Sequence, residues 1–179
     1  GIFGKHGGGL CEEMNLQSRV EIQMGTLSKA AGLAGGFIVG SQALIELLVN
    51  RARSFIYSTA PPPALAHAAR HAVGLIRSPQ GAQLREALQH NIALFTRGTL
   101  LPANRTPIIP IVLGGNEITV ATSAQLKENG FLVPAIRYPT VPRNRARLRI
   151  SLSALHTRES LLELRKWLEP FLPLIPQSR

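Results

Sequence analysis

The feature that most constrains the fold is a glycine-rich segment, GTLSKAAGLAGGF, which spans residues 25–37 and carries a single lysine, Lys29. Apolar and polar residues alternate over residues 20–24 ahead of it, which is typical of a strand with one buried face. A second short apolar run, residues 37–39, ends it. Because glycine is favoured where a backbone turns tightly or approaches another group, the glycines between the two runs predict a loop. The sequence therefore places Lys29 on a loop between two strands.

Two well-known lysine motifs do not describe Lys29. In a phosphate-binding P-loop the lysine follows the glycines, whereas Lys29 precedes them. Thr26 and Lys29 fit the Ser-x-x-Lys pattern of penicillin-recognising enzymes if threonine replaces serine, but the chain has neither Ser-Asp-Asn nor Lys-Thr-Gly. A lysine amine is a nucleophile only when neutral, and partial burial among apolar or cationic neighbours favours that form. A Schiff-base lysine remains, against the plainer interpretation of a surface charge.

Length and composition limit the number of domains and the class of protein that this chain can form. The chain has 179 residues, 45% of them hydrophobic, which is enough for one large domain or two small ones. Its single cysteine, Cys11, excludes an internal disulfide and cannot build a zinc site alone, so we expect no metal and a reducing, cytoplasmic setting. The least polar window, residues 30–49, contains Glu46 and four glycines, so we expect no membrane span.

The charge balance points to anionic partners. Twenty Lys and Arg against ten Asp and Glu give a net charge of +10, which suits nucleic acid, phosphorylated cofactors or an acidic carrier protein. Aromatic residues make up only 5% of the chain, too few for a platform that stacks single-stranded nucleic acid.

Periodicity predicts the elements of the first half. Residues 41–50 read as a helix with Ser41 as its N-cap. Residues 55–57 read as a short strand that three prolines stop. Residues 65–76 read as an alanine-rich helix. Residues 83–95 read as a second helix, opened by Ser78-Pro79, with an apolar face made of Leu84, Leu88, Ile92 and Phe95.

The second half predicts an α+β module. Residues 107–115, PIIPIVLGG, read as a buried strand, and residues 123–129 as the end of a helix with Gly130 as its C-cap. Residues 131–136 and 147–152 read as strands, the second with Leu148, Ile150 and Leu152 on one face and Arg147, Arg149 and Ser151 on the other. Thr157 caps a last helix whose expected core residues are Leu161, Leu164, Trp167, Leu168 and Phe171.

Three stretches together carry a family resemblance. They are GTLSKAAGLAGGF, RARSFIYSTAPPPA and IRYPTVPRNRARLRISLSALHT, and they span most of the chain. All three resemble the α-oxoamine synthases, pyridoxal-phosphate enzymes that condense an amino acid with an acyl thioester. The opening stretch, GIFGKHGGGL, resembles the residues that come directly after the Asp-Glu-Ala-His segment of that family. The resemblance implies that this chain is the carboxy-terminal half of a longer enzyme, with that segment upstream of Gly1.

The resemblance also implies a fold and a domain division. The expected fold class is α/β, of the type I aminotransferase-like pyridoxal-phosphate fold. Residues 1–80 would be the last part of a large three-layer α/β domain, and residues 81–179 a small carboxy-terminal α+β domain.

The family's functional residues map onto matching positions here. Lys29 would bind the cofactor aldehyde and later move a proton at the substrate α-carbon, and Thr26 would contact the cofactor phosphate. Ser58 and Thr59 match a hydroxyl pair that reaches the phosphate from the neighbouring subunit, which implies a homodimer with a shared active site. The plainer interpretation of Ser58 and Thr59 is turn capping before the prolines.

Two further positions match residues that line the substrate. Thr140 stands where the aminoketobutyrate ligases of the family carry valine, and Arg149 would hold the carboxylate of the amino acid through its planar guanidinium. The plainer interpretation of Arg149 is a solvated strand face. Asn144 replaces a glycine of the family, and asparagine tolerates positive φ better than other residues.

The resemblance is strongest to the biotin-pathway member of the family. It implies condensation of L-alanine with a pimeloyl thioester of CoA or acyl carrier protein. One alternative keeps the chemistry but uses glycine and a short acyl-CoA, as in 2-amino-3-ketobutyrate CoA ligase or 5-aminolevulinate synthase. Another alternative is a nucleic-acid-binding module, because five basic residues lie between Arg137 and Arg149. The enzyme, with no nucleic-acid or membrane partner, is the interpretation we adopt.

Overall fold

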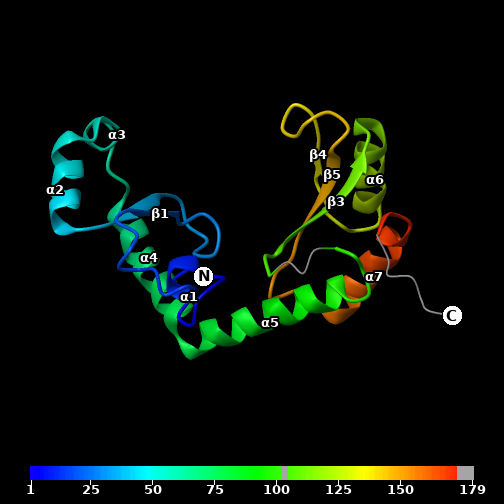
Figure 1. The fold of residues 1–179 in the computed structure, drawn as a ribbon, viewed down its shortest axis with the longest axis horizontal. Helices are drawn as coiled ribbons and strands as arrows, with labels where there is room; N and C mark the ends of the chain where they lie inside the picture. The colour runs from blue at the N-terminus through cyan, green and yellow to red at the C-terminus, as the bar shows by residue number, and fades with distance from the viewer. Residues whose placement is uncertain (102–104, 173–179) are drawn as a thin grey trace. The chain divides into compact units, whose positions relative to one another are not determined.

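The computed structural model describes residues 1–101 and 105–172, and the chain divides into two compact units, Gly1–Arg85 and Glu86–Arg179. The division lies a few residues beyond the domain boundary predicted after residue 80. Both positions fall within one long helix, α5 (Pro79–Thr96), as Figure 1 shows. No helix in the described part of the chain is long and apolar enough to cross a membrane.

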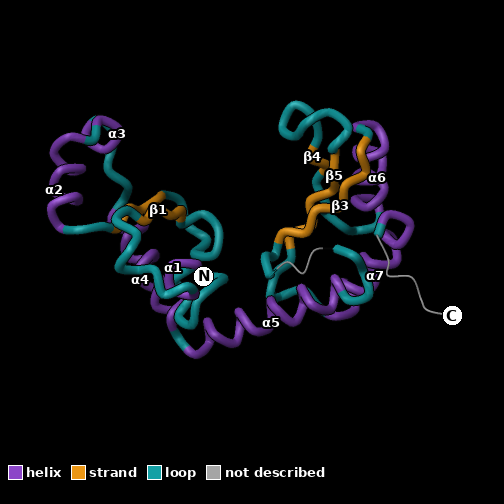
Figure 2. The backbone as a smooth tube through the Cα atoms, in the orientation of Figure 1, coloured by secondary structure: helices purple, strands orange, loops and turns teal. Residues whose placement is uncertain are grey.

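The first unit combines helices with two short strands (Figure 2). Besides the start of α5 they are α1 (Leu10–Glu13), β1 (Gln23–Thr26), β2 (Gly36–Val39), α2 (Gln42–Arg51), α3 (Arg53–Ile56) and α4 (Pro63–Arg77). The strands β1 and β2 pair antiparallel, with Gln23 opposite Val39 and Thr26 opposite Gly36. The predicted strand, loop and strand around Lys29 are therefore confirmed, although the first strand begins only at Gln23.

The longer helices of the first unit begin where capping chemistry predicts. Ser41 precedes α2, and its hydroxyl accepts a hydrogen bond from the backbone N–H of Leu44 at 3.3 Å. The helix α4 begins at Pro63. Proline has no backbone N–H, and it fits the first turn of a helix because an N–H there would have no helical partner. The helices predicted over residues 41–50, 65–76 and 83–95 correspond to α2, α4 and α5.

The strand predicted over residues 55–57 is wrong, because this stretch lies in and just after the helix α3. No strand in the described chain pairs with it, so its backbone groups bond locally. The N–H of Ile56 donates to the carbonyl of Ala52 at 2.9 Å, and that of Tyr57 donates to Arg53 at 3.0 Å. A short apolar run forms a strand only where another strand is available to pair with it.

The second unit contains a three-stranded antiparallel sheet, in the order β3, β5, β4, with the helix α6 against it (Figure 1). Its elements after α5 are β3 (Ile108–Gly114), α6 (Asn116–Glu128), β4 (Ala135–Ile136), β5 (Ala146–Ser151), α7 (Arg158–Leu168) and the short 3-10 helix η1 (Glu169–Phe171). Leu148 and Ile150 of β5 are buried, whereas Arg149 and Ser151 are exposed, as the alternation predicts. Ile109 and Ile111 of β3 are also buried, and the helices add further fully buried side chains: Phe95, Leu126, Leu161 and Leu168.

Three further predictions need correction, two of them in the second unit and one, at Leu84, in the part of α5 that belongs to the first unit. The strand predicted over residues 131–136 is limited to Ala135–Ile136, because Gly130 ends α6 with φ of +86° and Pro134 has no N–H to pair. Trp167, expected in the core, is 37% exposed, since the buried side of α7 is formed by leucines. Leu84, expected on the apolar face of α5, is also 37% exposed.

Candidate functional site

The loop between β1 and β2 carries Lys29 and is closed by backbone hydrogen bonds. At its base, the N–H of Leu27 donates to the carbonyl of Gly35 at 2.9 Å. Inside it, Leu33 donates to Leu27 at 2.8 Å and Gly32 donates to Lys29 at 3.0 Å. Gly32 has φ of +67°, a left-handed conformation that favours glycine, so the turn after Lys29 depends on this residue. The backbone that carries the lysine is thereby held in place.

The side chain of Lys29 turns back toward β1. Its ammonium donates a hydrogen bond of 2.9 Å to the hydroxyl oxygen of Thr26. Both residues are exposed, so the amine is accessible. The glycine ahead of Thr26 is needed for close packing, because a Cβ at Gly25 would clash with the ring of Phe37. Gly25 therefore leaves room for the ring of Phe37, its partner on β2.

A second loop, residues 4–9, folds around the carboxylate of Glu12 on α1. The backbone N–H of Gly8 donates to Glu12 Oε2 at 2.8 Å, and that of His6 donates to the same carboxylate at 3.1 Å. His6 Nδ1 lies 2.6 Å from Glu12 Oε1. The hydrogen bond from Gly8, followed by that from the His6 side chain, lowers the pKa of Glu12 because both stabilise the charged carboxylate.

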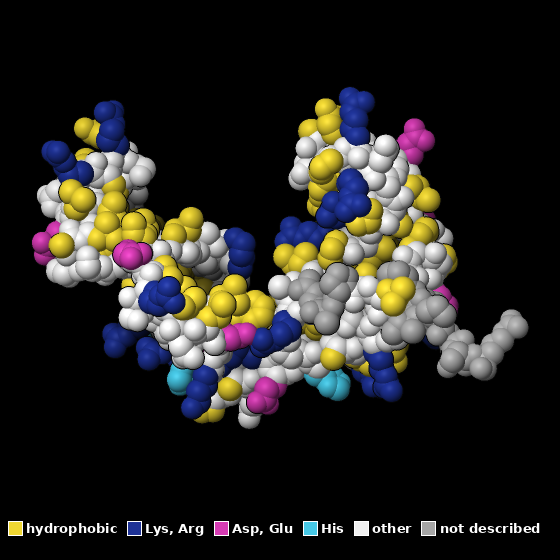
Figure 3. All heavy atoms as spheres, in the orientation of Figure 1, with side chains coloured by type: hydrophobic (Ala, Val, Ile, Leu, Met, Phe, Trp, Pro, Cys, Tyr) yellow, Lys and Arg dark blue, Asp and Glu magenta, His cyan; other side chains and the backbone are white. Residues whose placement is uncertain are grey.

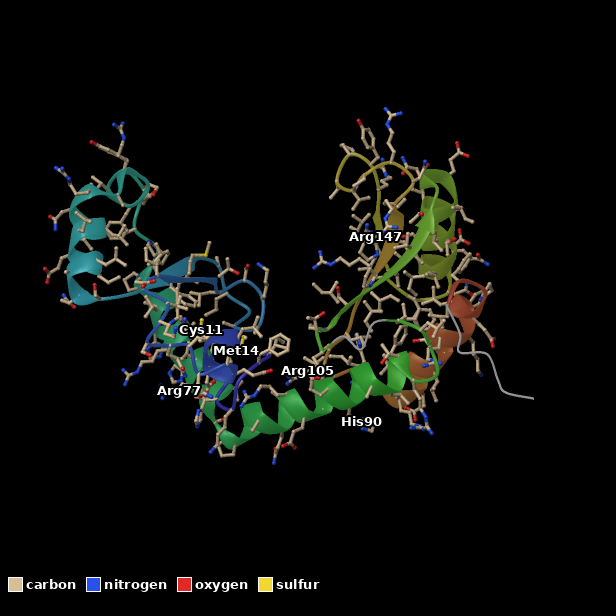
Figure 4. All side chains as sticks on the ribbon, viewed as in Figure 1. Cys11, Met14, Arg77, His90, Arg105 and Arg147 are labelled. Atoms are coloured by element: carbon tan, nitrogen blue, oxygen red, sulfur yellow. The ribbon has the colours of Figure 1, made fainter. Side chains whose placement is uncertain are left out.

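A cavity of about 530 Å³ in the first unit is lined by residues of both loops. Thr26 and Leu27 line it from the lysine loop, and His6 and Glu12 from the second loop. Arg77, at the end of α4 and labelled in Figure 4, is also among the lining residues. The hydroxyl of Thr26 thus shares a cavity with a carboxylate, an imidazole and a guanidinium.

Glu12 and His6 were not predicted as site residues. A signal for Glu12 is present in the sequence, since the carboxylate follows the glycine run GGG by a few residues and glycine-rich backbones offer their N–H groups to anions. The stretch GKHGGG alone does not reveal that its N–H groups bind a carboxylate of the same chain.

Ser58 and Thr59 lie in the exposed segment between α3 and α4. The hydroxyl of Ser58 donates to the backbone carbonyl of Ser54 at 2.5 Å, which is a capping contact at the end of α3. In the described chain no hydrogen bond joins either residue to Lys29 or Thr26. The structure therefore does not bring this pair to the lysine within one chain.

Thr140 and Arg149 belong to the second unit. Thr140 is exposed, and its N–H donates to the carbonyl of Arg137 at 2.9 Å. Arg149 lies on β5 and pairs with Pro110 of β3. Its guanidinium has no hydrogen bond or ion pair with any described residue. That guanidinium is available to an anion. Arg147 lies on the same strand (Figure 4).

The turn before β5 tests one departure from the family pattern. Asn144 has φ of +58°, so it adopts the left-handed conformation that the replaced glycine would suit. The prediction that asparagine keeps this turn is confirmed.

The chain matches known proteins over most of its length. Residues 2–168 match the family described as aminotransferase class I and II. The curated 8-amino-7-oxononanoate synthase of Janthinobacterium sp. (strain Marseille) is 44% identical over 169 residues, which cover 92% of this chain and 43% of that protein. The chain thus spans less than half the length of this curated relative.

Solved structures share the fold. The 8-amino-7-oxononanoate synthase from Francisella tularensis matches with a TM-score of 0.82 and 27% identity, over 94% of this chain and 51% of that one. A serine palmitoyltransferase from S. paucimobilis, with bound PLP-myriocin aldimine, matches with a TM-score of 0.85 and 23% identity, over 94% of this chain and 44% of that one. These likenesses confirm the predicted α/β fold class.

Proposed function

Because the chain belongs to the aminotransferase class I and II family, we propose that the protein containing it is a pyridoxal-phosphate-dependent acyltransferase that makes 8-amino-7-oxononanoate for biotin synthesis. The proposal extends the resemblance to the α-oxoamine synthases, which 44% identity to a curated member supports. The observation that carries it is the 2.9 Å hydrogen bond between Lys29 Nζ and the Thr26 hydroxyl on a closed loop. The activity belongs to the complete protein, of which this chain is one part.

The lysine loop fits pyridoxal phosphate. Lys29 offers an accessible amine that an aldehyde can bind, and Thr26 offers a hydroxyl that can donate to a phosphate. The serine palmitoyltransferase of the same fold holds PLP. When bound, pyridoxal phosphate supplies an electron sink for the negative charge that develops at the substrate α-carbon.

We assign proton transfer to Lys29. When its amine is not bound to the cofactor, Lys29 Nζ removes the α-proton of the amino acid and later delivers a proton to the product. The hydrogen bond to Thr26 and the closed loop fix where this amine lies. A base that is already positioned contributes to rate because less motion is needed in the transition state.

Arg149 and Thr140 are proposed to hold the substrates. Arg149 would bind the alanine carboxylate through two parallel hydrogen bonds, since its guanidinium has no other partner in the described chain. In the overall reaction the α-carbon of L-alanine bonds to the carbonyl carbon of a pimeloyl thioester. The thiol of CoA or of acyl carrier protein leaves, the alanine carboxyl leaves as carbon dioxide, and a proton adds to the α-carbon.

The partners proposed are a second copy of the protein and an acyl carrier. Ser58 and Thr59 lack a contact with Lys29 within the chain, which suits a role in the site of a neighbouring subunit of a homodimer. The net charge of +10 suits the phosphates of CoA or an acidic carrier protein. The family match favours this enzyme over the nucleic-acid-binding module that the basic run 143–149 also suggested.

The test uses the full protein loaded with pyridoxal phosphate. Borohydride reduction followed by peptide mass mapping is expected to place the cofactor on Lys29, and Lys29→Ala is expected to abolish both labelling and turnover. Lys127→Ala, an exposed lysine of α6, serves as the matched control and should change neither. Alanine and glycine are each assayed with pimeloyl, acetyl and succinyl thioesters. A label on another lysine contradicts the site, and preferred turnover of glycine contradicts the substrate.

A further inference from the structure

The helix α4 carries two histidines that converge on one point. His67 and His71 are four residues apart, so their side chains lie on the same side of the helix, one turn apart. Their Nε2 atoms are 3.1 Å apart, and the ring centroids are 4.7 Å apart with the ring planes at 62°. The contact is a hydrogen bond in which one Nε2–H donates to the other Nε2, so both nitrogens point at one position, and a metal ion bound there would replace the shared proton.

The pair stands on the polar side of α4. Both histidines are exposed, whereas the less exposed residues of α4 recur at intervals of three and four positions: Leu65, Ala68, Ala69, Ala72 and Ile76. On a helical projection, His67 and His71 lie opposite that stripe. A helix buries its apolar stripe against its neighbours, so the opposite side is the one that stays open to solvent.

The separation of the two nitrogens matches that of two ligands of one metal ion. Nitrogens that each lie about 2.0–2.1 Å from a metal, at right angles to one another, are about 2.9 Å apart, and a tetrahedral arrangement spreads them to about 3.4 Å. The observed 3.1 Å lies between these values. Imidazole nitrogens suit copper, nickel and zinc, whereas magnesium and calcium take oxygen ligands.

We propose that His67 and His71 form a binding site for a divalent transition-metal ion, with Cu²⁺, Ni²⁺ and Zn²⁺ as the class of ligand. The site goes beyond the proposed function, because neither histidine takes part in the lysine loop. No group of three or more His, Cys, Asp or Glu is gathered anywhere in the described residues, so this part of the chain offers two ligands, and water can fill the other positions. Arg70, between the two histidines in sequence, adds a positive charge that lowers the affinity for a cation.

The test is titration of the full protein, carrying no histidine tag, with Cu²⁺ and with Ni²⁺ by isothermal calorimetry. Cu²⁺ is included because it binds nitrogen sites most strongly in the divalent series. We expect one site, and we expect His67→Ala and His71→Ala each to weaken it by about tenfold or more, equivalent to about 1.4 kcal/mol. Alanine is a better helix former than histidine, so both variants keep α4 intact.

Two matched variants make the assignment specific. His90, exposed on α5 without a histidine one turn away (Figure 4), and His6, which already contacts Glu12, are each replaced by alanine. Both variants should bind the metal as the parent does. Paramagnetic broadening by Cu²⁺ in the unmodified protein should be strongest at the amides around residues 67–71. Unchanged binding in both α4 variants, or broadening centred on His6 or His90, overturns the proposal.

Discussion

The two units of the chain differ in what holds them together. In the second unit, Phe95 and Leu148 are 0% exposed, and other apolar side chains of its strands and helices are buried as well. In the first unit no large apolar side chain is buried, and on its sheet Met24 is 73% exposed and Phe37 46%. Figure 3 shows apolar side chains gathered on the visible surface of the first unit. The first unit therefore has the apolar residues of a core, but no other part of the unit covers them.

Polar contacts repeat this difference. In the second unit, buried Asn91 donates to the carbonyls of Ser153 and His156 at 2.9 and 3.0 Å, so its hydrogen bonds reinforce an existing core. In the first unit, Arg85 donates to the carbonyls of Ile76 and Lys5 at 2.7 and 2.8 Å and holds loops that pack over no core. Since the curated relative is more than twice as long, it has further chain that can cover such a surface.

The largest effect is expected when the two units are separated. A fragment of residues 79–179 should fold and unfold cooperatively on heating, because it keeps the whole buried core. A fragment of residues 1–96 should show no cooperative transition, because apolar surface left in water contributes none of the roughly 25 cal/mol per Å² that burial supplies. Circular dichroism and the dispersion of amide NMR signals measure both. A cooperative transition in residues 1–96 would contradict the comparison.

A matched pair of substitutions on β3 measures the core of the second unit. Ile111→Ala should lower the free energy of unfolding of the second unit by about 2–5 kcal/mol, because Ile111 is 2% exposed and its removal leaves a cavity. Val112→Ala, at the next position and 44% exposed, should cost about 1 kcal/mol or less. Urea denaturation followed by tryptophan fluorescence gives both values. Equal costs at the two positions would show that β3 does not separate a buried face from an exposed one.

The sequence was sufficient where local chemistry decides the structure. Residues 25–37 predicted a loop between strands because glycines separate two apolar runs, and β5 alternates because a strand has two faces. Thr157 caps α7 as predicted, with its hydroxyl accepting from Ser160 at 3.2 Å. Each of these features depends on residues within a few positions of one another.

The sequence was insufficient where distant groups decide. The stretch that forms α3 has the composition of a strand. A strand also needs a partner strand, and the composition of the stretch does not show whether one is available. Trp167 has the size of a core residue, yet the buried side of α7 is already filled by leucines such as Leu164. The roles proposed for Lys29 and Arg149 came from resemblance, since spacing alone left Lys29 with several possible roles.

The smallest effect is expected at Glu12, in the unit that lacks a core. The pKa of its carboxyl is lowered, first by the hydrogen bond from Gly8 and then by the contact with His6. A carboxyl with a lowered pKa stabilises the folded loop at pH values above its ordinary pKa, and this contribution is lost as pH falls through the lowered pKa. The loop of residues 4–9 should therefore loosen in acid while the second unit keeps its core. An NMR titration should show the Gly8 amide shifting with a midpoint below the ordinary range of a glutamate.

The substitution Glu12→Gln isolates that titration. Glutamine keeps an oxygen that accepts from the Gly8 N–H but has no ionisable group, so the acid transition of the Gly8 amide should disappear. The amide of Leu148, in the core of the second unit, should not respond to this change in either protein. A Gly8 transition that survives in Glu12→Gln would contradict the assignment and mean that another acid holds the loop. In that case the first unit would still depend on a carboxylate where the second depends on buried side chains, but the carboxylate would be a different one.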